Sequence, residues 1–133
     1  MKILGIEHIG IAVDSIDNKA PFWEKILGIE HLKKEKIDSQ SVITDIYDTG
    51  KGKIELLEST SCNSPINKFL KKKGNGIHHI CLQVDDIDNA IIHLKQNKIK
   101  IIGDKATLGA EGYRIIFIHP KETGGVLVEL AER

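Results

Sequence analysis

The sequence predicts an α+β fold made of two copies of a β-α-β-β-β module, and an internal repeat is the main reason. Residues 6–18, IEHIGIAVDSIDN, recur as residues 77–89, IHHICLQVDDIDN, 71 positions later with eight of thirteen residues identical. Residues 53–58, KIELLE, recur as residues 127–132, LVELAE, at a shift of 74. Strand-like alternation of apolar residues and glycine-containing turns divide each copy into similar elements. The chain therefore reads as a duplicated module.

Length and composition favour one domain with its own core. The chain has 133 residues, of which 41% are apolar, and this is sufficient to close a core without disulfides or metals. Its 19 basic residues balance 19 acidic ones. A chain without net positive charge has no basic field for DNA or RNA, so nucleic acid is an unexpected partner. A small neutral or anionic ligand fits better.

The sequence gives no sign of targeting to a membrane or of secretion. Residues 1–16 lack the basic segment, the continuous apolar run and the cleavage site of a signal peptide. No segment approaches the roughly 18 apolar residues of a membrane span. Cys62 and Cys81 are far apart and form no CxxC pair, so neither a disulfide framework nor a thiolate zinc site is expected. We expect a cytoplasmic protein with reduced thiols.

The first module, residues 3–59, begins with a strand over residues 3–14. Ile9, Ile11 and Val13 alternate with the small or polar residues His8, Gly10, Ala12 and Asp14, so the strand has one apolar face. A helix capped by Asp14 or Ser15 follows and ends at Gly28. Its packing stripe is expected to comprise Phe22, Ile26 and Leu27.

Three strands in meander order complete the first module, at residues 29–36, 41–48 and 53–58. Glu55 lies between Ile54 and Leu56, so its side chain points away from the apolar face of its strand. A polar loop then leads to a linker helix over residues 64–73, in which Ser64 is the N-cap and Pro65 the first helical residue.

The second module, residues 75–131, repeats this plan. Its first strand covers residues 76–84 and places Ile80, Leu82 and Val84 on the apolar face, opposite His79, Cys81 and Gln83. Asp85 or Asp86 caps a helix that runs to about Asn97, with Ile87, Ile91, Ile92, Leu94 and Lys95 at helical spacing. The remaining strands are expected at residues 100–102, 113–119 and 126–130, with a glycine-containing loop over residues 107–112 near the site.

Four residues of metal-ligand type occupy equivalent positions in the two copies: His8, Glu55, His79 and Glu129. Taken singly, each is more typical of a hydrogen-bonded histidine or an exposed glutamate. Together they converge if the two sheets curl around a shared concavity. Burying two carboxylates without a cation would cost several kcal/mol or force a proton onto one of them. The pattern therefore predicts a divalent metal centre that uses cobalt, manganese, nickel, zinc or iron.

Other polar residues near these positions have simpler interpretations. His78 should face the helices or the sheet edge and is expected to be structural. The basic residues Lys71 to Lys73 end a helix, where cations complement its dipole, although a phosphate anchor is the rival interpretation. We expect Gln83, on the same face as His79, and Lys121, in a turn where it can reach an anion, to bind substrate.

Four segments resemble the vicinal oxygen chelate (glyoxalase/bleomycin resistance) superfamily, and within it most closely the methylmalonyl-CoA epimerase family. They are GIEHIGIAV, KIELLE, SPINKFL followed by KKKGNGIHHICLQVDDI, and RIIFIHPKETGGVLVEL. The resemblance spans nearly the whole chain, and the last two segments are specific. It implies a glyoxalase-like fold, with paired modules forming a curved mixed sheet around a metal site, and a homodimer. It also implies that His8, Glu55, His79 and Glu129 bind the metal.

Members of that family interconvert the R and S forms of methylmalonyl-CoA, so the resemblance implies an acyl-CoA substrate. The proton between the thioester and the carboxylate is removed and returned on the other face. Glu129 is the better candidate for the base. A glutamate on the strand before Glu55 has been suggested as a second base in some members, but this chain has Thr44 there with Asp45 beside it. The second base is therefore open.

Two other functions are compatible with the same architecture. Glyoxalase I acts on a glutathione hemithioacetal with the same ligand types, but this chain lacks the Tyr-Asn-Trp-Gly type of segment typical of such enzymes. A bleomycin-resistance type of protein would bind a ligand without a metal and without chemistry. The presence of all four ligand-type residues argues against it, and a metal analysis would discriminate the two.

Overall fold

The computed structural model describes residues 1–133, which form two units. One unit comprises residues 8–78, and the other comprises residues 1–7 together with residues 79–133. The first strand, β1 (Ile3–Ala12), contributes residues to both units. Each unit is described by itself below.

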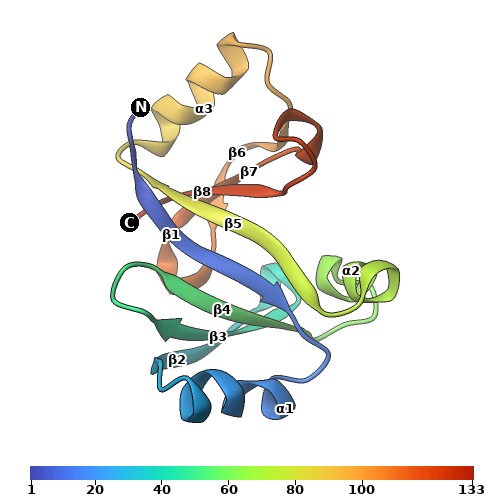
Figure 1. Ribbon diagram of the computed structural model, residues 1–133. Helices are drawn as coiled ribbons and strands as arrows, with labels where there is room; N and C mark the ends of the chain where they lie inside the picture. Colours follow the sequence, from blue (N-terminus) through green and yellow to red (C-terminus); the bar gives the residue numbers. More distant parts are fainter. The chain divides into compact units, whose positions relative to one another are not determined.

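The unit of residues 8–78 is a mixed sheet with helical segments, in the strand order β2-β3-β4-β1 (Figure 1). β1 and β4 are parallel, whereas β2 and β3, and β3 and β4, are antiparallel. The elements after β1 are α1 (Ile16–Pro21), the π-helical turn η1 (Phe22–Ile26), β2 (Glu30–Ile37), the 3-10 turn η2 (Asp38–Gln40), β3 (Val42–Asp48), β4 (Lys53–Ser59) and α2 (Pro65–Lys73).

The unit of residues 1–7 and 79–133 has the corresponding order, β5-β8-β7-β6, with β5 and β8 parallel. Gly10 pairs with Glu55 in the first copy and Cys81 pairs with Glu129 in the second, so the strand register repeats as well as the sequence. The elements are β5 (Gly76–Val84), α3 (Ile87–Gln96), β6 (Ile101–Leu108), the 3-10 turn η3 (Ala110–Gly112), β7 (Arg114–Ile118), the 3-10 turn η4 (Pro120–Glu122) and β8 (Val128–Glu132).

The helix starts follow the predicted capping residues. The Asn18 amide donates to Ser15 Oγ, the Asn67 amide donates to Ser64 Oγ at 3.0 Å, and the Asn89 amide donates to Asp86 Oδ1 at 3.0 Å. Each bond satisfies an amide that the first turn of a helix leaves without a partner. Of the two cap candidates in each copy, Ser15 and Asp86 are therefore the ones used.

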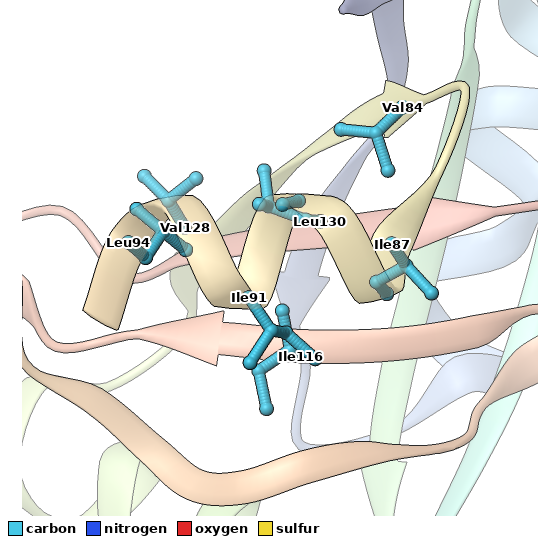
Figure 2. Close-up of a cluster of buried hydrophobic side chains, with 8 residues drawn as sticks. Val84, Ile87, Ile91, Leu94, Ile116, Val128 and Leu130 are labelled. Atoms are coloured by element: carbon cyan, nitrogen blue, oxygen red, sulfur yellow. The ribbon is translucent and has the colours of Figure 1, made fainter. Parts of the chain in front are cut away.

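Helix α3 covers one face of its sheet and forms the main core of its unit (Figure 2). Its buried residues Ile87, Ala90, Ile91 and Leu94 pack on Val84, Ile116, Val128 and Leu130. Val128 and Leu130 flank Glu129, so the glutamate side chain points to the opposite face of β8. The apolar face predicted for β5 is confirmed, because Ile80, Leu82 and Val84 all join this core.

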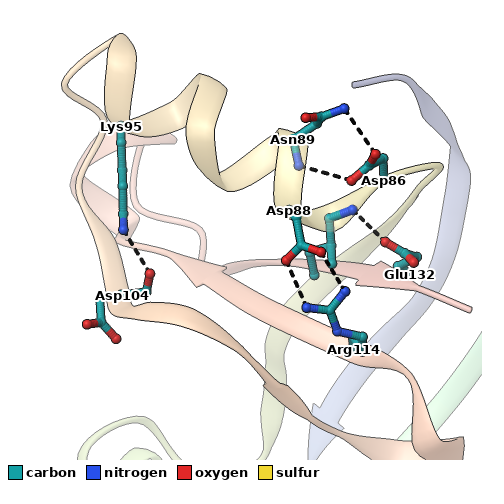
Figure 3. Close-up of polar contacts among 8 residues, drawn as sticks. Asp86, Asp88, Asn89, Lys95, Asp104, Arg114 and Glu132 are labelled. Carbon is teal, nitrogen blue, oxygen red and sulfur yellow. Dashed lines mark hydrogen bonds and ion pairs between the residues drawn. The ribbon is translucent and has the colours of Figure 1, made fainter.

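Polar contacts fix the start of α3 to the neighbouring strands (Figure 3). Arg114 of β7 binds Asp88 through two hydrogen bonds of 2.9 and 2.8 Å. The Ile87 amide donates to Glu132 Oε2 at 2.6 Å. In the first copy the Ile16 amide donates to Glu58 Oε1 at 2.8 Å, so both copies use the last glutamate of the repeated motif to hold the helix start.

The packing stripe predicted for the first helix is wrong. Phe22, Ile26 and Leu27 are 50%, 75% and 52% exposed. The chain passes from α1 into the π-helical turn η1 at Phe22, directly after Pro21. A π-turn rotates the following side chains relative to an α-helix. As a result Ile16, Ala20 and Trp23 pack on the sheet instead.

Two smaller expectations also differ from the structure. Ile92 was expected on the packing stripe of α3 but is 52% exposed, and Ala90 is buried in its place. The strand predicted at residues 100–102 extends to Leu108, with a register shift between Ile102 and Thr107. This irregularity interrupts the alternation of apolar and polar residues, so the full length of the strand could not be predicted from the sequence. The glycine-containing loop is therefore shorter, starting at Gly109.

None of the helices is both long enough and apolar enough to cross a lipid bilayer.

Candidate functional site

The first copy brings His8 and Glu55 together on the sheet face away from α1. His8 lies on β1, and β1 pairs with β4 so that Gly10 is opposite Glu55. Because His8 is two residues before Gly10, its side chain is on the same face as that of Glu55. His8 Nδ1 lies 3.1 Å from Glu55 Oε2. The two residues are only 5% and 2% exposed.

The second copy brings His79 and Glu129 together in the same diagonal arrangement. Cys81 pairs with Glu129, and His79 precedes Cys81 by two residues. His79 Nε2 lies 3.3 Å from Glu129 Oε1, and both residues are 6% exposed. The Phe117 ring stands edge-on to the imidazole at 5.9 Å between centroids, and this contact orients His79.

The donor set of each pair fits a divalent cation. Imidazole nitrogen and carboxylate oxygen are ligands that borderline divalent metals accept. Each pair is buried, so the carboxylate must be balanced by a positive charge beside it or neutralised by a proton. Gly10 and Ala12 beside His8 leave space on that face, because neither has a side chain larger than a methyl group.

The two residues predicted to bind substrate, Gln83 and Lys121, take no part in the His–Glu contacts. Gln83 pairs with Ala131, on the same face of β5 as His79, and is half-buried. Lys121 lies in η4 and is exposed, and its amide donates to His119 Nδ1. His78, expected to be structural, packs edge-on against Phe69 at 5.1 Å between ring centroids.

Asp45, adjacent to Thr44, points away from the face that carries Glu55. Its carboxylate accepts a hydrogen bond of 2.5 Å from Tyr47 Oη and lies 2.6 Å from His31 Nε2. Tyr47 belongs to the core under α1, so this network is on the helix side of the sheet. Burial raises the pKa of the Tyr47 hydroxyl and the hydrogen bond to Asp45 raises it further. The tyrosine therefore remains a proton donor that holds the buried carboxylate.

Thr44 and Glu55 are on the same face of the sheet, the face away from α1, which is called the open face below. The partner of Thr44 on β2 is Glu35. Ile46 pairs with Glu55, and Thr44 lies two residues before Ile46. Glu35 pairs with Thr44, and paired residues of adjacent strands point to the same face. Glu35 is not among the residues predicted from the sequence. The pairing between β2 and β3 identifies it, and strand alternation alone was not informative because β2 is a run of charged residues.

Comparisons with known proteins identify the family of the chain. Residues 7–117 match the model of the Glyoxalase/Bleomycin resistance protein/Dioxygenase superfamily. The chain is 38% identical to the mitochondrial methylmalonyl-CoA epimerase of Bos taurus over 128 residues, covering 96% of this chain and 73% of that protein.

Two solved structures have the same fold. A methylmalonyl-CoA epimerase in complex with methylmalonyl-CoA and NH4+ has a TM-score of 0.93 at 32% identity, covering 98% of this chain and 95% of that one. A variant of the Streptomyces coelicolor enzyme in complex with 2-nitronate-propionyl-CoA has a TM-score of 0.92 at 31% identity, and 98% of each chain is covered. The predicted glyoxalase-like α+β fold is thereby confirmed. The chain belongs to the glyoxalase/bleomycin resistance protein/dioxygenase superfamily and, within it, to the family of the methylmalonyl-CoA epimerases.

Proposed function

We propose that this protein interconverts the R and S epimers of methylmalonyl-CoA, with a divalent metal ion bound by His8, Glu55, His79 and Glu129. The observation that carries the proposal is the pair of buried His–Glu contacts, of 3.1 and 3.3 Å, at equivalent positions of the two copies. Relatives with this fold are named for the reaction, and two of them hold an acyl-CoA ligand or analogue. A homodimer stays a prediction.

The proposed reaction moves one proton. The carbon between the thioester and the carboxylate is acidic because a negative charge left on it spreads onto both carbonyl groups. A metal ion held by the four ligands would stabilise that charge by attracting the carbonyl oxygens. Glu129 accepts the proton as the C–H bond breaks, acting as a general base. Glu129 is 6% exposed, and this burial limits the access of bulk water during the step.

Proton exchange at the α-carbon tests the proposed function. The purified protein is incubated with one epimer of methylmalonyl-CoA in deuterated water, and proton NMR follows the α-proton. We expect loss of the α-proton signal together with conversion to the other epimer. The glutathione hemithioacetal of methylglyoxal is assayed in parallel. Turnover of that substrate, with no exchange at methylmalonyl-CoA, would establish the glyoxalase alternative instead.

Metal content tests the ligand set independently of activity. His79→Ala removes one donor, so we expect the metal bound per chain to fall sharply in elemental analysis after dialysis. His78→Ala is the matched control, because His78 is the neighbouring histidine and packs on Phe69. That control should keep its metal. Equal metal content in both variants would contradict the assignment of His79, and a wild-type protein that binds no metal would favour the bleomycin-resistance type of function.

A further inference from the structure

One proton transfer of the proposed reaction has no residue assigned to it. Inversion of a carbon centre requires that a proton leaves from one face and a proton arrives on the other. A single carboxylate held on one side of the carbon returns the proton to the side from which it came. A second group able to carry a proton is therefore needed.

The two residues expected at the second position do not provide such a group. Thr44 is on the open face but its hydroxyl is not a base at neutral pH. It is 2% exposed, and its Oγ1 donates to the Glu35 carbonyl at 3.2 Å. Asp45 carries a carboxylate, but that carboxylate is turned to the helix side and held by Tyr47 and His31.

Glu35 places a carboxylate in the row that Thr44 occupies. Rows of paired residues cross the open face of this unit, and two adjacent rows concern Glu55 and Glu35. The row with Glu55 runs through Gly10, Glu55, Ile46 and Lys33, and the next row runs through Ala12, Leu57, Thr44 and Glu35. Strand spacings of about 4.8 Å and a rise of about 3.3 Å per residue put the Cα atoms of Glu35 and Glu55 about 12 Å apart.

A small acyl group fits within that separation. A glutamate side chain reaches several ångströms from its Cα atom, and the residues between the two glutamates on this face are Leu57, Thr44 and Ile46. Asp48, in the row on the other side of Glu55, pairs with Glu30 and accepts a hydrogen bond from the Gly50 amide in the turn. The Glu35 side chain is 31% exposed and lies 3.3 Å from Lys33 Nζ, at the edge of the sheet where solvent can exchange its proton.

We propose that Glu35 is the second proton-transferring residue of the epimerase, and this inference depends on the proposed function. In one direction Glu129 forms an O–H bond while the α C–H bond breaks, and the electron pair of that bond enters the enolate. The enolate then forms a new C–H bond with the proton of Glu35, whose O–H electron pair remains on the carboxylate. In the reverse direction the two glutamates exchange roles, so no other reactant is consumed.

Exchange measured separately from each pure epimer tests Glu35. Wild-type protein should introduce deuterium into both epimers and interconvert them. Glu35→Gln should lower interconversion by about 10²–10⁴-fold, the usual contribution of a general acid or base. It should still introduce deuterium, without inversion, into the one epimer whose proton is removed by the remaining base. Glu35→Asp, which keeps the carboxylate, should interconvert the epimers faster than Glu35→Gln.

Lys33→Gln is the matched control, because it removes the same ion pair from the other side. It should interconvert the epimers within a few-fold of the wild-type rate. The assignment is overturned if Glu35→Gln interconverts at the wild-type rate, if it loses exchange with both epimers alike, or if Lys33→Gln has the same defect. Thermal unfolding of each variant is compared with wild type to confirm folding. If the wild-type protein introduces deuterium into neither epimer, the proposed function itself is contradicted.

Discussion

The two copies of the module carry the same His–Glu pair but differ one row further along the open face. In the first copy, the row beside the pair contains Thr44 and Glu35, whereas the equivalent row of the second copy contains Ile115 and Thr107. Ile115 packs with Cys81 and Ala131 in an apolar cluster. The copies thus share the residues that we propose to bind metal and differ in what surrounds them.

We propose that this difference gives the two copies different roles in proton transfer. Glu129 pairs with Cys81 and Phe117, which belong to this apolar cluster. A polar edge beside Glu55 is suited to a group that exchanges protons with solvent. The histidines differ as well, since His8 approaches its glutamate through Nδ1 and His79 through Nε2. The two equivalent pairs therefore have different neighbours.

The largest effect expected from this comparison separates Glu129 from Glu55. Both are proposed ligands, but only Glu129 is proposed to accept the proton. Glu129→Gln should lower exchange by about 10²–10⁴-fold even when metal is added in excess. Glu55→Gln should weaken metal binding, and excess metal should restore exchange. Titrating metal into each variant while measuring α-proton exchange checks this. If excess metal restores exchange equally in both variants, the proposed difference in role between Glu129 and Glu55 is wrong.

The sequence predicted the duplicated parts of the molecule well, because two similar segments are expected to fold in the same way. The equivalent pairing of Gly10 with Glu55 and of Cys81 with Glu129 follows from the two shifts in the sequence. Glu35 could not be identified from the sequence, because β2 consists mostly of charged residues. It therefore lacks the alternation of apolar and polar residues that would show which face each side chain occupies. The position of Glu35 depends on pairing between strands, which a single sequence does not contain.

The helices also show what the sequence alone could not predict. The stripe of Phe22, Ile26 and Leu27 has helical spacing, but the π-turn after Pro21 rotates it away from the core. Helical spacing identifies an apolar stripe only when the helix is continuous. The second copy has no such turn in α3, and Ile87, Ile91 and Leu94 of the predicted set are buried, whereas Ile92 and Lys95 are exposed.

The two helices should therefore respond differently to the same substitution. Ile91→Ala removes a side chain that is 6% exposed in the α3 core, so we expect a loss of about 2–5 kcal/mol in the free energy of unfolding. Ile26→Ala alters a side chain that is 75% exposed, and the change should stay within about 0.5 kcal/mol. Chemical denaturation of both variants measures the difference. A large loss from Ile26→Ala would show that a further contact covers η1.

The smallest expected difference concerns the aspartate at the second position of each helix. Asp88 on α3 forms two hydrogen bonds with Arg114, and its equivalent Asp17 on α1 lies 3.8 Å from Lys34 Nζ with both side chains largely exposed. The hydrogen bonds from Arg114 lower the pKa of Asp88 below its ordinary value of 3.8. Because the pKa is depressed in the folded state, this carboxylate stabilises the fold above about pH 4, and the contribution is lost as the pH falls through the lower folded pKa.

Unfolding midpoints in urea, measured between pH 2 and pH 7, resolve this contribution. Asp88→Asn should unfold slightly earlier than wild type at neutral pH, and its curve should meet the wild-type curve at the acidic end, where Asp88 is protonated in both states. Asp17→Asn should follow the wild-type curve throughout, since a single contact between exposed side chains contributes little. If Asp17→Asn and Asp88→Asn depart from wild type alike, the bidentate geometry on α3 contributes nothing beyond an ordinary surface charge, and the copies are equivalent at this position.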